Sequence, residues 1–377
     1  MERAVELSTG ELRVHGMVDK LELDQLCGFA SRKNPNRPFL FVSRVLGRHI
    51  PATPAVMRLV CRLLVEKLPA DVTGPATVIG MAETAVGLGH GVHDLWRMAS
   101  GRDDLLFIHS TRYRIGAHPI LAAFEETHSH ATGHLLHRPA SADDAALLTA
   151  SRTLVLVDDE ATTGATFVAL ATTLREEMPR LSRIVCVTIT DWMGASRRQD
   201  VRTAMPVQTD FVSLLEGGYS FFPASVPPPE MPHVTGNGDH KDHLLPVNWG
   251  RLGLRQPRPL PDHVLGISAR PGERILVLGT GEFVFPPFHL AERLATMGAD
   301  VMVQSTTRSP ILEGNAIQGT LTFPDAYADG IPNYLYSVHP GQYDRVLVCY
   351  ETPPETAQNQ LIATLGAEAI YFNHGTR

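Results

Sequence analysis

The segment at residues 154–166, LVLVDDEATTGAT, constrains the fold more than any other part of the sequence. Four apolar residues are followed by two adjacent acids, Asp158 and Asp159, and then by a Thr-Thr-Gly turn. Behind the turn, residues 167–177 have the pattern of a helix that ends before a Met-Pro pair. This order predicts a buried strand that leads through a short loop into a helix. The loop amides and the helix N-terminus would then point at one place, which suits an anion.

The residue types of this segment fit a sugar phosphate. The hydroxyl groups of Thr162, Thr163 and Thr166 are hydrogen-bond donors, and Gly164 lets the backbone approach a phosphate closely. The two adjacent carboxylates are good acceptors for the two hydroxyls of a ribose. A phosphate in the loop and a diol on the acids together describe the ribose 5-phosphate half of phosphoribosyl pyrophosphate. The alternative is an ordinary strand-to-helix loop with a capping threonine.

Short apolar runs elsewhere predict the rest of the first unit. We expect strands at 77–80, 105–109, 153–157 and 184–189, and helices at 54–68 and 167–177. Uninterrupted apolar strands that alternate with helices indicate an α/β fold whose parallel sheet is covered on both faces.

Residues 221–262 break this pattern, because they are crowded with proline and glycine and show no apolar periodicity. Proline cannot donate hydrogen bonds to a helix or a sheet, so we expect an extended linker here. The linker would separate a first domain at 1–220, which includes N-terminal hood elements, from a smaller second α/β domain at 263–377.

A second phosphate-binding loop is predicted within residues 78–89, VIGMAETAVGLG, directly after an expected strand. The backbone amides from Ala82 to Ala85 could hold a diphosphate, usually together with Mg²⁺. Glu83 could hold the metal through water, and Thr84 could donate to a phosphate oxygen. The alternative is an ordinary strand-to-helix turn with a capping threonine.

Residues 110–138 lie between these two motifs and contain three arginines and five histidines. Arg112 and Arg114 suit a diphosphate, because a guanidinium group forms paired hydrogen bonds with phosphate oxygens. His128 and His130 are candidates for contacts with the phosphate or the base. Solvated loop histidines are one alternative. A structural metal site is another, with four candidate ligands: His128, His130, His134 and His137.

Five stretches together resemble one bacterial family: VIGMAET, HSTRY, FEETHSHATGHLL, VLVDDEATTGAT and QSTTRSP. Over residues 20–377 the chain is similar to phosphoribosyltransferase-like proteins with a C-terminal TRSP domain, which occur in tellurite-resistance and related stress gene clusters. The acidic motif is typical of the type I phosphoribosyltransferase superfamily, whereas HSHATGH and TTRSP are typical of this family. The resemblance implies a type I phosphoribosyltransferase-like parallel sheet core with a hood.

The resemblance also implies an activity. A magnesium-dependent transferase would attach ribose 5-phosphate from phosphoribosyl pyrophosphate to an unidentified base-like acceptor, as a step towards a nucleoside-like metabolite. Asp158 and Asp159 would hold the ribose hydroxyls and Mg²⁺, the metal mostly through the ligand, while Arg112 and Arg114 would face the diphosphate. The 5′-phosphate would be held by the loop that follows: Glu160, Ala161, Thr162, Thr163, Gly164, Ala165 and Thr166.

Several expectations about substrates and partners complete this interpretation. We expect base specificity to reside in a hood built from residues 20–50 and 210–225. Partner enzymes encoded in the same gene cluster are implied, and a homodimer is left open. A non-catalytic regulator or sensor that binds phosphoribosyl pyrophosphate is the main alternative function, and a scaffold for neighbouring stress proteins is another.

The second unit repeats the order of the first. Expected strands at 274–279, 301–304 and 345–349 lead into the loops TGEF, STTRSP and YETPPET, at spacings close to those of the first unit. We therefore interpret the C-terminal domain as a degenerate copy of the core; the alternative is that any α/β unit gives such intervals. Cys349 and Tyr350 would stand where the copy requires acids, so the copy has no ribose site. Arg308 is a candidate for anion binding or for closing the interdomain interface.

Composition excludes several other classes of protein. The net charge of −7 and the lack of a long Lys/Arg block argue against a nucleic-acid-binding protein. No apolar run approaches the length of a membrane span, and the N-terminus has no signal-peptide core. The four cysteines are scattered without a CxxC pair, which argues against a thiolate zinc site and fits a reducing cytoplasm.

Overall fold

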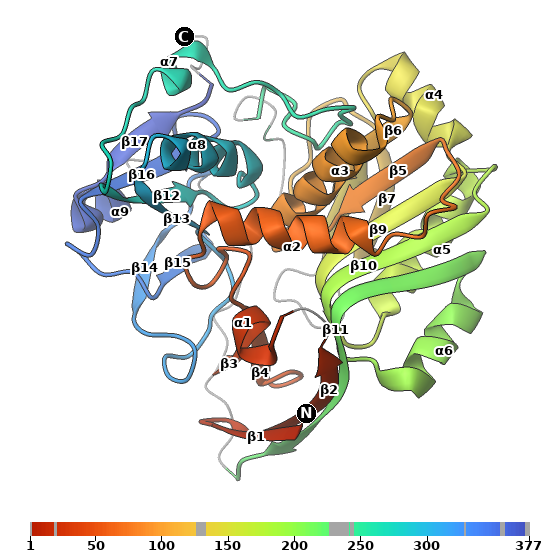
Figure 1. Cartoon of the computed structure of the whole chain (residues 1–377), viewed down its shortest axis with the longest axis horizontal. Coiled ribbons are helices and arrows are strands. Elements are labelled where there is room, and N and C mark those ends of the chain that lie inside the picture. The colour runs from red at the N-terminus through yellow and green to blue at the C-terminus, as the bar shows by residue number, and fades with distance from the viewer. Residues whose placement is uncertain are drawn as a thin grey trace.

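The computed structural model describes residues 2–18, 21–125, 133–225, 241, 245–327, 329–354 and 359–373. Within these residues a larger and a smaller β-sheet form the centres of two α/β units, and α2 (Pro54–Glu66) passes between them (Figure 1). No helix in this part of the chain is long and apolar enough to cross a bilayer.

The larger sheet has the strand order β1-β2-β11-β10-β9-β5-β6. Its parallel core consists of β5 (Ala76–Gly80), β6 (Leu105–His109), β9 (Thr153–Ala161), β10 (Arg183–Asp191) and β11 (Gln208–Pro223). The antiparallel strands β1 (Glu2–Leu7) and β2 (Gly10–Val18) extend it beyond β11. The four strands predicted from apolar runs are confirmed. β9 is longer than predicted, because it continues through the acids and pairs with β10 up to Ala161.

Helices cover both faces of this sheet, as predicted. The crossover α3 (Val86–Ser100) leads from β5 outward to β6, whereas α5 (Ala165–Glu177) leads from β9 in the opposite direction to β10. Right-handed crossovers in opposite directions place these two helices on opposite faces. α2 packs on α3, while α4 (Ala142–Ala150) and α6 (Gly194–Ala204) complete the layers. The Thr53 hydroxyl accepts from the amide of Val56 and fixes the start of α2.

Two hairpins stand at the carboxyl edge of the larger sheet. The first, formed by β3 (Cys27–Ser31) and β4 (Phe39–Ser43) after α1 (Leu23–Leu26), makes up the N-terminal hood. Its aromatic side chains anchor it, because Phe41 stacks on Trp192 with ring centroids 4.5 Å apart and Phe39 contacts Tyr219 edge-on. The second hairpin is formed by β7 (Ile120–Glu125) and β8 (Gly133–His137).

The smaller sheet is entirely parallel. Its order is β13-β12-β16-β17, with β12 (Arg274–Gly279), β13 (Asp300–Ser305), β16 (Arg345–Tyr350) and β17 (Glu368–Tyr371). The helices α7 (Asp262–Leu265), α8 (Phe285–Thr296) and α9 (Asn359–Leu365) and the hairpin of β14 (Thr320–Pro324) and β15 (Pro332–Tyr336) surround it. When strands are paired by their order along the chain, β12, β13, β16 and β17 correspond to β5, β6, β9 and β10. The two sets have the same order in their sheets, which supports the interpretation of the second unit as a degenerate copy.

The described parts of the segment between the units are more ordered than their composition suggests. β11 runs to Pro223, and Leu254 exchanges two backbone hydrogen bonds of 2.8 Å with Phe107 of β6. Trp249 and Arg251 are buried. Residues 245–254 are therefore packed rather than extended through solvent, because their apolar and charged side chains find partners on both units. The predicted domain boundaries themselves remain predictions.

Candidate functional site

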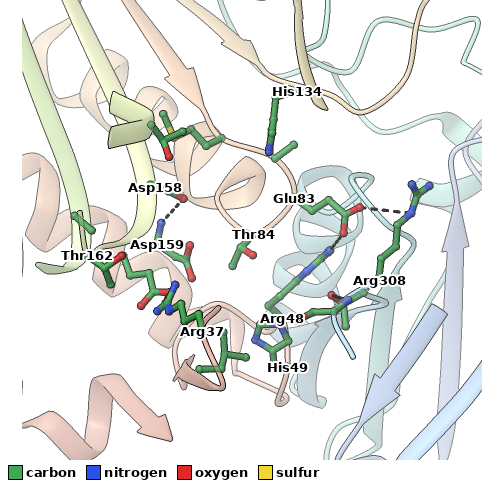
Figure 2. Close-up of a pocket in the computed structure, with 18 of the residues that line it drawn as sticks. Arg37, Arg48, His49, Glu83, Thr84, His134, Asp158, Asp159, Thr162 and Arg308 are labelled. Carbon is green, nitrogen blue, oxygen red and sulfur yellow. Dashed lines mark hydrogen bonds and ion pairs between the residues drawn. The ribbon is translucent and has the colours of Figure 1, made fainter. Parts of the chain in front are cut away.

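A cavity of about 150 Å³ opens at the carboxyl ends of β5, β6 and β9 (Figure 2). The hood lies along one side of the cavity. The loop that follows β13 in the C-terminal unit closes another side with Thr307, Arg308 and Ser309. Ligands of open α/β sheets bind at this edge, so the topology alone marks the cavity as the candidate site.

Three consecutive acids line the cavity at the end of β9. The amide of Asp159 donates to Oδ1 of Asp158 at 2.9 Å, and both side chains are partly exposed (Figure 2). The next acid, Glu160, accepts from a guanidinium nitrogen of Arg37 at 2.7 Å. Because Arg37 belongs to the hood and lies over the rings of Phe39 and Phe41, this ion pair fastens the hood to the acidic motif.

The predicted phosphate loop joins these acids to α5. Gly164 has a φ of 70°, a conformation that favours glycine, and a Cβ there would lie 2.6 Å from Cγ2 of Val201. Gly164 has no side chain to cap α5, so the partial positive charge of the helix N-terminus faces the cavity. Four predicted loop residues line the cavity together with Gly164: Ala161, Thr162, Thr163 and Thr166. Ala165 is not among the lining residues.

The second predicted loop lies across the cavity from the acids. The amide of Ala82 donates to the hydroxyl of Ser110 at 2.9 Å, and the Ala82–Glu83 peptide bond is cis. Ala82, Glu83 and Thr84 line the cavity, whereas Ala85 is buried at the start of α3.

The Glu83 carboxylate is surrounded by guanidinium groups. It forms an ion pair with Arg48, and its Oε1 lies 3.6 Å from Nε of Arg308 (Figure 2). The same oxygen lies 3.7 Å from Nε of Arg112. These three arginines come from the chain after the hood, from the loop after β6 and from the C-terminal unit. A metal ion bound to Glu83 through water, as predicted, would therefore compete with three guanidinium groups for the carboxylate.

Comparison with known proteins identifies the chain. The sequence profile of the phosphoribosyl transferase family matches residues 26–218, and the profile of the TRSP domain found C-terminal to that family matches residues 260–365. The chain belongs to the phosphoribosyl transferase family. No curated protein matches it.

Solved structures of other phosphoribosyltransferases are similar to this chain. An adenine phosphoribosyl transferase from Trypanosoma brucei, solved with AMP, pyrophosphate and ribose-5-phosphate, is 14% identical with a TM-score of 0.36, and the match covers 51% of this chain and 77% of that one. The Leishmania donovani adenine enzyme gives the same values. An orotate phosphoribosyltransferase from Aeropyrum pernix is 16% identical with a TM-score of 0.28, covering 47% and 78%.

The histidine-rich stretch of this phosphoribosyl transferase family member is only partly described. His128 and His130 lie outside the described residues. His134 lines the cavity and stacks on Phe124, while both ring nitrogens of His137 lie within hydrogen-bond distance of backbone carbonyls. Among the described residues, no three His, Cys, Asp or Glu side chains are placed to hold one metal ion together. The role of His137 here is to hold the loop after β6.

The two arginines predicted for the diphosphate separate in the structure. Arg112 lines the cavity, whereas Arg114 is exposed and is not among the lining residues. The two side chains are two positions apart in the loop after β6, and the backbone turns between them, so only one faces inward. Arg112 therefore keeps its predicted position at the cavity, and the structure does not bring Arg114 there.

Sequence reasoning missed the cationic residues that the hood region contributes: Arg32, Arg37, Arg48 and His49. Burial, together with the neighbouring charges of Arg48 and Arg32, lowers the pKa of His49 to about 3, so this ring is neutral. The stretch RPFLFVSRVLGRHIP carries most of these residues and was the available signal. The other predicted hood segment, residues 210–225, does not line the cavity and instead packs behind the hairpin through Tyr219 and Phe221.

Proposed function

We propose that the protein is a phosphoribosyltransferase that uses phosphoribosyl pyrophosphate and Mg²⁺ to attach ribose 5-phosphate to a base-like acceptor. The observation that carries the proposal is the convergence of three features on one cavity. These are the acid pair, the glycine-containing loop at the N-terminus of α5, and the arginine-surrounded loop after β5. In this proposal the acid pair binds the diol of the donor, the loop before α5 binds its 5′-phosphate, and the loop after β5 binds its diphosphate.

Each group of residues has a part in the transfer. Asp158 and Asp159 accept the ribose hydroxyls, and the amides after Thr162 hold the 5′-phosphate. When the bond between C1 and the diphosphate breaks, the ring gains positive charge and the leaving group carries the negative charge. Arg48 and Arg112 stabilise that leaving diphosphate, so catalysis consists mainly of positioning and charge stabilisation.

The residues present fit Mg²⁺. The metal prefers oxygen ligands and keeps several waters, and the partly exposed carboxylates of Asp158 and Asp159 line the cavity with room for ligand oxygens between them and the second loop. These two acids would hold the metal, mostly through the bound ligand. Mg²⁺ would neutralise charge on the diphosphate.

The biological setting is part of the proposal and rests on the sequence resemblance alone. A nucleoside-like product, a place in a stress or tellurite-resistance system, partner enzymes, a homodimer and a cytoplasmic location remain predictions. A non-catalytic regulator with the same donor site is the second candidate. Release of inorganic pyrophosphate from the donor, in the presence of Mg²⁺ and a metabolite extract that supplies acceptors, supports the enzyme; donor binding without such release supports the regulator.

The double variant Asp158→Asn, Asp159→Asn tests the ribose assignment. We expect it to weaken donor binding at least about tenfold, because each lost charge-assisted hydrogen bond contributes roughly 1.5–3 kcal/mol. Stability should change little, since both side chains are partly exposed and repel each other. Isothermal calorimetry with phosphoribosyl pyrophosphate and thermal unfolding measure the two effects. Unchanged affinity would contradict the assignment.

A further inference from the structure

The loop proposed to hold the diphosphate carries no positive charge of its own. Residues 81–85 read Met-Ala-Glu-Thr-Ala, so its single charged side chain, Glu83, is negative. A diphosphate brought to this loop needs cations from other parts of the chain. The structure brings three guanidinium groups to that place, and one of them, Arg308, comes from the TTRSP motif of the C-terminal unit.

These guanidinium groups are held out of solvent. The side chains of Arg48, Arg112 and Arg308 are 3%, 10% and 12% exposed, and Glu83 among them is 9% exposed. Asp329 is a further carboxylate near Arg308, at 3.1 Å, but it also pairs with Lys241 at 3.0 Å. Burying cations costs free energy unless anions accompany them. Glu83 lies near all three arginines, so an anion with several charges that displaced it would meet guanidinium groups from three parts of the chain.

The C-terminal unit also fixes the positions of these arginines. Arg308 donates to the hydroxyl of Tyr113 and to Asp329, which fixes its guanidinium plane at the cavity wall. Arg48 donates to the backbone oxygen of Gly281 at 2.7 Å and to the hydroxyl of Ser305 at 2.9 Å, both in the C-terminal unit. Two of the three guanidinium groups therefore depend on the C-terminal unit.

We propose that Arg308 binds the diphosphate of the donor, so that the C-terminal domain completes the site of the first domain. Glu83 occupies the diphosphate position in the ligand-free protein, and it gives up its arginines when the diphosphate enters. This inference rests on the proposed function, because the anion it names is the leaving group of that reaction. Its chemistry is that of a bidentate guanidinium–phosphate contact.

The first experiment measures binding of three separate probes to the full-length chain in the presence of Mg²⁺: inorganic pyrophosphate, phosphoribosyl pyrophosphate and ribose 5-phosphate. Arg308→Gln should weaken binding of the first two about tenfold or more and leave ribose 5-phosphate unchanged. Arg274→Gln is the matched control, because Arg274 pairs with Asp344 on the surface of the same unit. Equal losses for all three probes, or no loss for pyrophosphate, would overturn the proposal.

The second experiment uses a variant that we expect to bind pyrophosphate more tightly rather than more weakly. Glu83→Gln keeps the size of the side chain but removes the charge that competes for the arginines, so pyrophosphate should bind several-fold more tightly. A metal-binding role for Glu83 requires the opposite result. Weaker pyrophosphate binding would show that Glu83 does not compete with the diphosphate for the arginines. If Arg308→Gln does not fold, Arg308→Lys keeps the charge and removes the paired geometry. We then expect a smaller, pyrophosphate-specific loss, and wild-type affinity would refute the bidentate contact.

The two proposals fail in different ways. If the unchanged chain binds neither pyrophosphate nor phosphoribosyl pyrophosphate, the proposed function itself is wrong. If the unchanged chain binds both and Arg308→Gln binds them equally well, the donor site is right and the contribution of the C-terminal domain is wrong.

Discussion

Glu351 is a buried acid whose ionisation depends on two neighbours. Both its oxygens accept from Nη1 of Arg251, at 3.0 and 2.9 Å, while Nε of Arg251 lies 3.2 Å from Glu282. Burial raises the pKa of Glu351 to about 7, and the charge of Glu282 adds to the effect against the attraction of Arg251. Burial would raise the pKa of Glu282, but the charge of Arg251 and hydrogen bonds from the hydroxyl of Thr111 and the amide of Arg112 hold it below its ordinary value. One arginine thus serves two carboxylates.

The raised pKa predicts a stability that falls as the pH rises. The native state holds the Glu351 proton up to about pH 7, whereas the unfolded chain releases it near the ordinary glutamate value, so stability declines between these two pH values. Glu351→Gln should remove this decline and gain on the order of 1–3 kcal/mol over the wild type at pH 8, but little at pH 5. Urea unfolding at several pH values measures it.

Glu368→Gln provides a control of opposite sign. The pKa of Glu368 is lowered by its hydrogen bond with Arg345 at the protein surface, so its small contribution is lost as the pH falls rather than as it rises. Parallel stability profiles for wild type and Glu351→Gln from pH 5 to 8 would mean that Glu351 ionises normally.

At the scale of elements, the junction of β9 and α5 depends on one glycine. Gly164→Ala combines an unfavourable φ with a contact of 2.6 Å to Val201, so we expect a loss of roughly 1–3 kcal/mol in unfolding free energy and weaker donor binding. Gly101→Ala is the matched control, because Gly101 has a φ of 64° at the end of α3 and nothing within 4 Å of an added Cβ. It should lose about 1 kcal/mol and leave donor affinity unchanged. Urea unfolding measures the loss of stability in both variants, and calorimetry measures donor affinity. Equal effects in the two variants would show that the unfavourable φ alone accounts for the losses.

The elements of the core could be predicted because their signals are local. The strand through 153–157 is an uninterrupted apolar run, and the acids and the glycine that follow it are adjacent in sequence, so spacing alone placed the first half of the site. The cationic half could not be placed in the same way. Arg48 and Arg308 are 260 positions apart in the sequence, and only the packing of two units brings them to Glu83.

The linker shows the same limit. Proline and glycine predict an extended linker over residues 221–262, but composition does not report which isolated side chains become buried. The deciding contacts are long-range, since the Arg251 side chain reaches Glu282 and Glu351. A similar difference separates Arg112 from Arg114, whose directions are set by a turn that the sequence pattern does not reveal.

At the scale of the whole molecule, the two sheets direct their carboxyl edges at one another. The loops after β5 and β6 meet the loops after β12 and β13 through the ion pair of Glu83 with Arg308 and the hydrogen bonds of Glu282 with Thr111 and Arg112. On one side α2 lies between the units (Figure 1) and joins them, because Arg58 contacts Glu292 of α8 and Asp94 of α3. An interface that contains buried charges and three packed helices couples the folding of the units.

We therefore expect the two units to unfold together. Trp192 reports on the first unit, where it stacks on Phe41, and Trp249 reports on the aromatic cluster with Phe283 and Phe372 in the second. Two full-length variants, each keeping one of these tryptophans and carrying phenylalanine at the other tryptophan positions, should give coincident urea transitions by fluorescence. Circular dichroism of the unchanged chain checks that the replacements do not alter the midpoint. Inorganic pyrophosphate with Mg²⁺ should raise both midpoints equally, because its proposed ligands come from both units. Transitions that separate, or a shift confined to the Trp192 signal, would show that the C-terminal unit folds and acts apart from the donor site.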